Sequence, residues 1–227
     1  MALLTPATVH ALLDAHGLHP KRSLGQNFLV DPNTARRVVA LADLPAGAPV
    51  LEIGPGLGSL TLALLDAGHD VVALELDDRL AAVLRTVVAD ADAGARVRVE
   101  HGDAMRVDLA ALLAPAPSPR ACVSNLPYNV AVPVVVRLLE EAETVERILV
   151  MVQREVGERL AAGPGDAQYG AVSVKVAYFA EAQVVGLVPP TVFVPKPKVD
   201  SALVRLRRRT VVVRRAAFAA ARAALNA

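Results

Sequence analysis

The chain has 227 residues, enough to bury one substantial core with room for one domain and a small appendage. Its hydrophobic content of 54% argues against an intrinsically disordered chain. No apolar run approaches the roughly 20 residues of a membrane-spanning helix, and no signal peptide is recognisable. The single cysteine, Cys122, excludes an internal disulfide and a Cys-based zinc cluster, so we expect a soluble cytoplasmic protein with no membrane partner.

The net charge of +1 conceals an asymmetry along the chain. From Pro195 to the end there are nine Lys or Arg and one acid, Asp200, so this segment carries +8 and leaves −7 for the first 194 residues. Such a distribution indicates either a basic face for a phosphate backbone or a solvated Arg-rich tail, and charge alone does not separate the two. The nine basic residues are Lys196, Lys198, Arg205, Arg207, Arg208, Arg209, Arg214, Arg215 and Arg222.

Two proline-led helix starts open the chain. Thr5-Pro6, followed by apolar positions up to Gly17, predicts a capped first helix, and Asp31-Pro32 opens a second helix in the same way. From Val50 onward, short β-branched runs alternate with helical stretches, a pattern typical of a doubly wound α/β fold with a mostly parallel, seven-stranded sheet. The predicted strands are 50–53, 71–76, 97–100, 121–124, 148–153, 184–188 and 202–206, and the predicted helices include 57–67, 79–89 and 132–141.

Four residues lie where the chemistry of such a fold is found. In open parallel sheets, ligands bind outside the carboxyl ends of the strands. The first, second and fourth predicted strands end at, or are followed by, Gly54, Glu75 and Asn125, and Asp103 follows the third. We therefore expect these four residues to share one site.

The loop after the first strand is rich in glycine. Gly54, Gly56 and Gly58 stand at alternate positions, which lets the backbone turn tightly and approach a ligand without a Cβ in the way. A dinucleotide fingerprint would place its third glycine at position 59, where this chain has serine. The spacing favours S-adenosyl-L-methionine, which has no pyrophosphate to seat on a helix N-terminus, over a nicotinamide cofactor.

Two carboxylates are the predicted polar contacts of this cofactor. Glu75 follows Gly54 by 21 residues and could accept hydrogen bonds from both ribose hydroxyls. The alternative is a surface glutamate in an acidic trio with Asp77 and Asp78. Asp103 could accept a hydrogen bond from the adenine amine of the cofactor, and its alternative is a loop residue that caps the next helix.

Asn125-Leu-Pro-Tyr128 directly follows the fourth predicted strand. The exocyclic amine of a base is a poor nucleophile because its lone pair is delocalised into the ring. Acceptors at both of its N–H bonds would localise that lone pair, and we predict Asn125 Oδ1 and the Leu126 carbonyl for this role. Pro127 would hold the backbone and Tyr128 would stack on the base. The alternative is an ordinary turn, which the position after this strand disfavours.

The predicted chemistry needs no strong general base, because the amine becomes acidic only once it is methylated and cationic. A neutral asparagine also avoids trapping the positive sulfonium of the cofactor. Positioning and electrostatics then supply the rate.

Three further segments carry a family resemblance. Together with the motifs above, 23–29 (Ser-Leu-Gly-Gln-Asn-Phe-Leu), 151–156 and 193–202 resemble the small-subunit ribosomal RNA adenine dimethyltransferases from about Lys21 to Arg207. The resemblance implies a Rossmann-like class I S-adenosylmethionine methyltransferase. It implies that segment 23–29 covers the cofactor, and that Phe193 stacks on the face of the target adenine opposite Tyr128. The implied cofactor contacts are Asn27, Leu29, Gly54, Gly56, Glu75, Asp103 and Asn125.

The same resemblance implies a product, N6,N6-dimethyladenine, at two adjacent adenines in the 3′-terminal hairpin of 16S rRNA. The implied partner is this RNA in the 30S subunit or its precursor, and we expect a monomer. A sister group methylates 23S rRNA and confers macrolide resistance. Asn129-Val-Ala-Val-Pro133 and Pro195-Lys-Pro-Lys198 favour the small-subunit group over it.

The carboxyl end departs from the family pattern. Family members continue into a C-terminal helical domain that helps to hold RNA, whereas this chain stops after one Ala/Arg-rich helix predicted from Arg214 to Asn226. We expect residues 1–209 to form the methyltransferase domain with an N-terminal helical cap, and residues 210–227 to be a remnant of the helical RNA-binding domain.

Two other function classes remain open. A non-catalytic RNA-binding or ribosome-assembly factor could keep this fold, and a nicotinamide oxidoreductase would need a hydride-transfer His or Lys that the sequence does not place at the sheet edge. Cys122 lies in an apolar strand and is interpreted as core. The histidines lack metal-ligand spacing, so no metal site is predicted.

Overall fold

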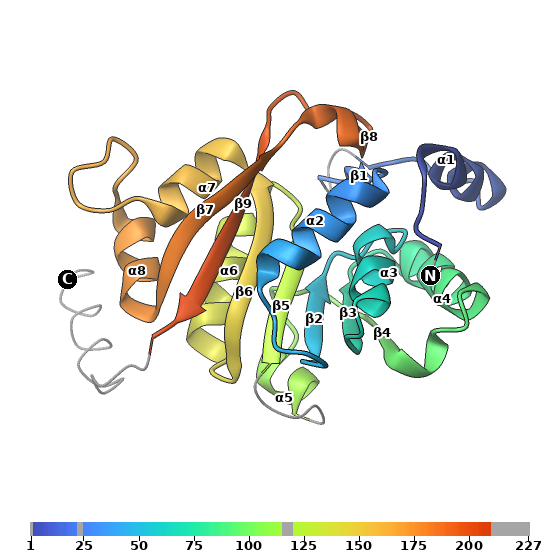
Figure 1. The fold of residues 1–227 in the computed structure, drawn as a ribbon, viewed down its shortest axis with the longest axis horizontal. Helices are drawn as coiled ribbons and strands as arrows, with labels where there is room; N and C mark the ends of the chain where they lie inside the picture. The colour runs from blue at the N-terminus through green and yellow to red at the C-terminus, as the bar shows by residue number, and fades with distance from the viewer. Residues whose placement is uncertain (1, 22–24, 115–119, 210–227) are drawn as a thin grey trace.

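The computed structural model describes residues 2–21, 25–114 and 120–209. Figure 1 shows a central sheet with helices on both faces. The helices are α1 (Pro6–Ala15), α2 (Pro32–Ala42), α3 (Ser59–Asp66), α4 (Asp78–Asp90), α5 (Leu109–Leu113), α6 (Ala131–Glu141), α7 (Arg154–Ala161) and α8 (Ala171–Phe179), with 3-10 turns η2 (Gly94–Arg96) and η3 (Pro190–Val192). The strands are β1 (Phe28–Leu29), β2 (Val50–Ile53), β3 (Val71–Glu75), β4 (Val97–His101), β5 (Arg120–Asn125), β6 (Val145–Gln153), β7 (Ala180–Val188), β8 (Phe193–Val194) and β9 (Ser201–Arg208).

The two predicted proline-led starts are confirmed. Thr5 caps α1 by accepting a hydrogen bond from the Thr8 N–H, and Asp31 caps α2 by accepting one from the Thr34 N–H. Both caps satisfy an amide that the helix itself leaves without an acceptor, and the following proline has no N–H to satisfy.

The seven-stranded sheet confirms the predicted fold class. Its order is β4-β3-β2-β5-β6-β9-β7, in which β4 to β6 run parallel and β9 is antiparallel to both of its neighbours. The order reverses between β2 and β5, which is where a doubly wound sheet opens a crevice for ligands. None of the helices in the described part of the chain is long and apolar enough to cross a membrane.

The side chains of successive strand residues point to opposite faces of the sheet and pack in two separate hydrophobic cores. Val50 joins the core beneath α2, α3 and α4, whereas its neighbour Leu51 joins the core with α5, α6 and α8. Cys122 is fully buried in the second of these cores. Burial raises the pKa of its thiol to about 12, so the interpretation of Cys122 as core is confirmed.

Two strands begin three or four residues earlier than predicted. Strand β6 starts at Val145 rather than 148, and β7 starts at Ala180 rather than 184. The added residues include Glu146 and Glu181, both exposed. Charged side chains on the solvent side of a strand obscure its hydrophobic pattern, whereas pairing with β9 still satisfies the backbone.

Strand β9 and the residue that follows it, Arg209, account for four of the nine C-terminal basic residues. Arg208 donates to the carbonyls of Leu138, Leu139, Ala142 and Val145 and so closes the carboxyl end of α6. Arg207 pairs with Asp43, Arg209 pairs with Glu181, and Arg205 donates to Gln183. These residues find partners within the chain, although the side chains of Arg207 and Arg209 stay about half exposed. Arg214, Arg215, Arg222 and the helix predicted from Arg214 to Asn226 lie outside the described residues.

A small second sheet lies above the carboxyl ends of the main strands (Figure 1). In it, Phe28 and Leu29 of β1 pair antiparallel with Val194 and Phe193 of β8. This pairing ties the N-terminal segment 25–30 to the chain that leads into β9, and Phe28 of β1 lies close to Gly56 of the glycine loop.

Candidate functional site

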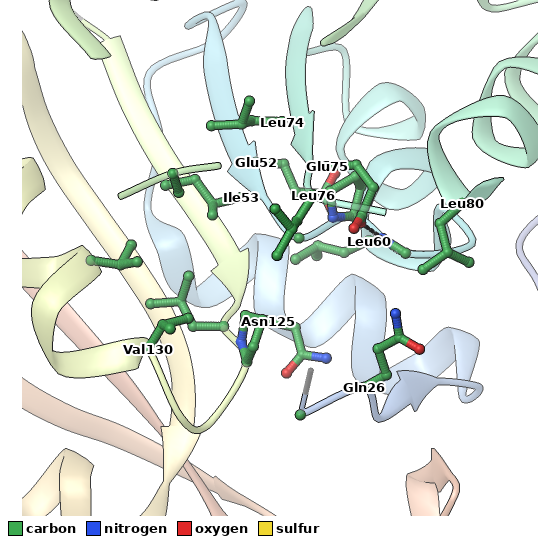
Figure 2. A pocket seen from close by; sticks show the side chains of 18 of the residues that line it. Gln26, Glu52, Ile53, Leu60, Leu74, Glu75, Leu76, Leu80, Asn125 and Val130 are labelled. Carbon is green, nitrogen blue, oxygen red and sulfur yellow. Dashed lines mark hydrogen bonds between the residues drawn. The ribbon is translucent and has the colours of Figure 1, made fainter. Parts of the chain in front are cut away.

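One pocket gathers the four residues predicted at the strand ends. Gly54, Glu75, Asp103 and Asn125 all line a cavity with a volume of about 1020 Å³, counted out to its open mouth. Figure 2 shows Glu75, Leu76 and Leu80 on one side of it, Val130 on the other, and Asn125 between them. A concave, mostly apolar site with a few polar groups in its wall is typical of small-molecule cofactor sites.

The glycine loop needs its glycines for packing as well as for ligand approach. Gly54 and Gly56 have φ of +71° and +59°, where a side chain is strained. A Cβ on Gly56 would lie 2.9 Å from the ring of Phe28, and one on Gly54 would lie 3.4 Å from Pro127 Cδ. The bare backbone therefore lets β1 and the Asn125–Tyr128 motif close onto the loop.

Glu75 is buried in the pocket wall, with 6% of its surface exposed. Its Oε2 accepts a hydrogen bond of 3.0 Å from the Gly56 N–H, and its Oε1 accepts one of 3.0 Å from the Asp77 N–H. Desolvation raises the pKa of Glu75, and these two backbone donors oppose that shift. The alternative of a surface glutamate is wrong. Asp78 is the one exposed residue of the acidic trio, whereas Asp77 is buried and pairs with Lys21 at 2.6 Å.

Asp103 lies at the pocket in a tight turn after β4. Its Oδ1 accepts a hydrogen bond of 2.8 Å from the Met105 N–H. The next helix, α5, is capped instead by Asp108, whose side chain accepts from the Ala111 N–H. The alternative role of Asp103 as that helix cap is therefore wrong, and part of its carboxylate remains accessible to a ligand.

Asn125 has a fixed side-chain orientation. Its Nδ2 donates a hydrogen bond of 3.1 Å to the carbonyl oxygen of Asn27. A carbonyl can only accept, so the amide nitrogen has to face Asn27. Oδ1 then points away from Asn27 and is free to act as an acceptor within the pocket that Asn125 lines.

The rest of the motif is held by neighbouring strands. Leu126 is buried, and its N–H donates to the Met151 carbonyl at 3.1 Å. The Tyr128 hydroxyl lies 2.8 Å from Ser201 Oγ, at the start of β9. The pocket is lined by Leu126, Pro127 and Tyr128. The motif is therefore part of the pocket wall, held by hydrogen bonds to β6 and β9, and is not an isolated turn.

The N-terminal segment covers part of the pocket, as the resemblance implied. Asn27 and Leu29 line it, and the Leu29 carbonyl accepts a hydrogen bond of 2.5 Å from Ser59 Oγ at the start of α3. Asn27 Nδ2 donates to the Gly25 carbonyl. Ser23 and Leu24 of the same motif lie outside the described residues.

Phe193 is placed differently from its predicted role. Its side chain is 3% exposed and packs in the hydrophobic core beside the helices of one sheet face. It pairs with Leu29 across the small sheet, and the residues lining the pocket in the described chain do not include it. In this conformation Phe193 packs beneath the N-terminal segment that lines the pocket, and its ring is not exposed to the pocket.

Leu76, Met105 and Glu52 are among the pocket residues that the sequence reasoning missed. Leu76 and Met105 line the pocket, and both are exposed large apolar side chains. Glu52 is a buried carboxyl in β2, and its Oε2 accepts a hydrogen bond of 2.6 Å from Thr61 Oγ1. A charged residue inside an otherwise apolar strand was the available signal for Glu52.

Glu52→Gln is expected to change how stability depends on pH. Desolvation raises the pKa of Glu52 to about 8, so in the unliganded protein the folded state holds a proton that the unfolded state releases near pH 4.5. Stability contributed by the neutral carboxyl is therefore lost as pH rises from about 4.5 through about 8. Thermal melts from pH 5 to 9 should show a steeper decline for wild type than for Glu52→Gln, and parallel curves would contradict the assignment.

The comparisons with known proteins agree with this geometry. The sequence model described as "Ribosomal RNA adenine dimethylase" matches residues 17–218. The curated "Ribosomal RNA small subunit methyltransferase A" of Thermobifida fusca is 53% identical over 209 residues, covering 91% of this chain and 71% of that protein. The protein of the same name from Streptomyces coelicolor is 50% identical over 215 residues, covering 94% of this chain and 74% of that protein.

The chain belongs to the ribosomal RNA adenine dimethylase family. Two solved structures extend the comparison. A dimethyladenosine transferase from Plasmodium falciparum has a TM-score of 0.70 and 27% identity, covering 80% of this chain and 63% of that one. The 23S rRNA methyltransferase ErmE has a TM-score of 0.71 and 33% identity, covering 84% of this chain and 74% of that one.

Membership of the dimethylase family makes the chain an S-adenosylmethionine-dependent methyltransferase, as predicted. The residues present fit that cofactor. The buried Glu75 carboxylate is suited to ribose hydroxyls, Asp103 supplies an acceptor for an amine, and the glycine loop brings bare backbone to the same cavity. A nicotinamide oxidoreductase is excluded by the family.

Proposed function

We propose that the chain transfers methyl groups from S-adenosylmethionine to N6 of two adjacent adenines in the 3′-terminal hairpin of 16S rRNA, giving N6,N6-dimethyladenine. The observation that carries the proposal is the hydrogen bond from Asn125 Nδ2 to the Asn27 carbonyl, which leaves Asn125 Oδ1 as an acceptor in the pocket. The names of the curated relatives support the choice of the small-subunit RNA.

Asn125 and Leu126 are proposed to orient the target amine. Asn125 Oδ1 accepts one N–H and the Leu126 carbonyl accepts the other, which localises the N6 lone pair toward the reacting methyl. Pro127 keeps the carbonyl before it in place, and the Tyr128 ring supports the base. Because Phe193 is buried, it is left out of this set.

Glu75, Asp103 and the glycine loop are proposed to hold the cofactor, with Asn27 and Leu29 closing over it. The cofactor, when bound, supplies an electrophilic methyl group on a sulfonium. Asn125 lies between the two sides of the pocket (Figure 2), and its neutral amide would add no negative charge that could trap a positive sulfonium. Preorganised acceptors and exclusion of water then provide the rate, with no residue acting as a strong base.

The setting of the reaction is also proposed. We infer a cytoplasmic monomer that acts on 16S rRNA within the 30S subunit or its precursor, as a step of ribosome biogenesis. Residues 1–209 form the methyltransferase domain, with α1 as a cap that Arg79 holds through the His16 and Gly17 carbonyls. Residues 210–227, assigned to a remnant of the helical RNA-binding domain, lie outside the described residues.

Mass spectrometry of the adenines tests the proposal. The protein is incubated with S-adenosylmethionine and 30S particles that lack the modification, and in parallel with unmodified 50S particles. We expect N6,N6-dimethyladenine at two adjacent positions of 16S rRNA and none in 23S rRNA. Modification of 23S rRNA alone would favour the function named for ErmE, and cofactor binding without methylation of either RNA would favour a non-catalytic assembly factor.

A further inference from the structure

Tyr128 is tethered at its far end to a rigid part of the sheet. Its hydroxyl lies 2.8 Å from Ser201 Oγ, and Ser201 is fully buried. Ser201 begins β9, where it pairs with Gln153 of β6 on one side and Val188 of β7 on the other. Burial raises the pKa of the Tyr128 hydroxyl, and the hydrogen bond with Ser201 opposes this shift. The ring is therefore fixed both by its backbone and through its oxygen.

The first and second methyl transfers to one adenine differ in the number of hydrogen bonds that can orient its N6 amine. An unmodified amine has two N–H bonds, one for Asn125 Oδ1 and one for the Leu126 carbonyl. After the first transfer only one N–H remains, so one of these acceptors has no partner. The orientation of the base then depends more on contact with the Tyr128 ring, because stacking does not require an N–H.

We propose that Ser201 is a positioning residue which, by holding the Tyr128 ring, sustains the second methyl transfer to each adenine. In each transfer N6 forms a bond to the methyl carbon as the bond between that carbon and sulfur breaks, and one N6 proton passes to water. The inference rests on the proposed function and extends it. It assigns to a buried serine of β9, remote from the motif in sequence, control over the number of methyl groups added.

Ser201→Ala is the direct test. The net contribution of one hydrogen bond is about 1 kcal/mol, which corresponds to roughly a fivefold change in rate. We expect the second transfer to slow by about this factor, so that N6-monomethyladenine accumulates early in a time course, while the first transfer and the affinity for S-adenosylmethionine change less than about twofold. Mass spectrometry of the RNA at several times measures both transfers.

Ser173→Ala is the matched control. Ser173 is also a buried serine, and its hydroxyl donates to the Arg159 carbonyl and accepts from the Gly170 N–H, in α8 and away from the pocket. Its removal should cost similar stability and leave the ratio of monomethyl to dimethyl product unchanged. If Ser173→Ala raised the monomethyl fraction as much as Ser201→Ala does, a general loss of stability would explain the effect and the proposal would fail.

Tyr128→Phe provides a second route should Ser201→Ala fold poorly. It removes the tyrosine hydroxyl, which is the other partner of the hydrogen bond with Ser201, and keeps the aromatic ring. We expect monomethyladenine to accumulate here too, and the double variant should match Tyr128→Phe in product ratio because the bond can be lost only once. Dimethyladenine alone, formed by both single variants at all times, would overturn the inference. The absence of any methyladenine with the wild-type protein would instead overturn the proposed function.

Discussion

Asn125→Ala is expected to lower the rate of methyl transfer by at least about 10²–10³-fold, the loss typical when one preorganised hydrogen-bonding group of an active site is removed. The variant loses the acceptor proposed for the target amine, and it also loses the donor that holds the Asn27 carbonyl. Incorporation of labelled methyl groups into unmodified 30S particles measures the rate. A thermal melt of the same preparation checks that the fold is intact.

Asn33→Ala serves as its control. Asn33 is exposed on the first turn of α2, and it does not line the pocket. The same change of residue type there should leave transfer at the wild-type rate. A rate within about threefold of wild type for Asn125→Ala would remove the central residue from the proposed mechanism.

Glu75→Ala is expected to weaken binding of S-adenosylmethionine by about 10²–10⁴-fold. Two hydrogen bonds to a charged carboxylate contribute about 1.5–3 kcal/mol each, and a factor of ten corresponds to about 1.4 kcal/mol. The variant also leaves the Gly56 and Asp77 amides without their acceptor, which loosens the glycine loop. Titration calorimetry with the cofactor measures the affinity.

Asp78→Asn separates this effect from a general loss of negative charge near the loop. Asp78 is exposed at the first turn of α4, three residues from Glu75. Its neutralisation should change cofactor affinity by less than about threefold, since exposed charges in water interact weakly. Equal losses in the two variants would argue that Glu75 does not contact the cofactor.

The strands and the location of the pocket could be predicted because local patterns determine them. Strand 50–53 is apolar except for Glu52 and ends at a glycine loop, and its bounds are as predicted. The positions of Glu75, Asp103 and Asn125 follow from the same argument, because parallel strands bring their carboxyl ends to one edge. None of these predictions required knowledge of contacts between distant segments.

What escaped prediction depends on contacts across long stretches of sequence. β1 and β8 are two-residue strands from distant parts of the chain, which pair Phe28 with Val194 and Leu29 with Phe193, and Phe193 is buried there. The bond between Tyr128 and Ser201 joins residues 73 positions apart. In the sequence Arg208 belongs to a basic cluster, whereas in the structure its guanidinium donates to carbonyls at the end of α6. Charge and periodicity carry no information about such partners.

Strand β9 runs from Ser201, which contacts Tyr128, to Arg208 at the other end of the sheet. Along this length it is antiparallel to β6. Eight residues are separated by seven steps of about 3.3 Å, so the last residue of β9 lies about 23 Å from Ser201, at the opposite end of the strand. An RNA contact made close to Arg209 would therefore hold a part of the substrate remote from the target adenine. Changes there would alter how tightly the RNA is held, while the geometry at N6 would remain set by the other end of the same strand.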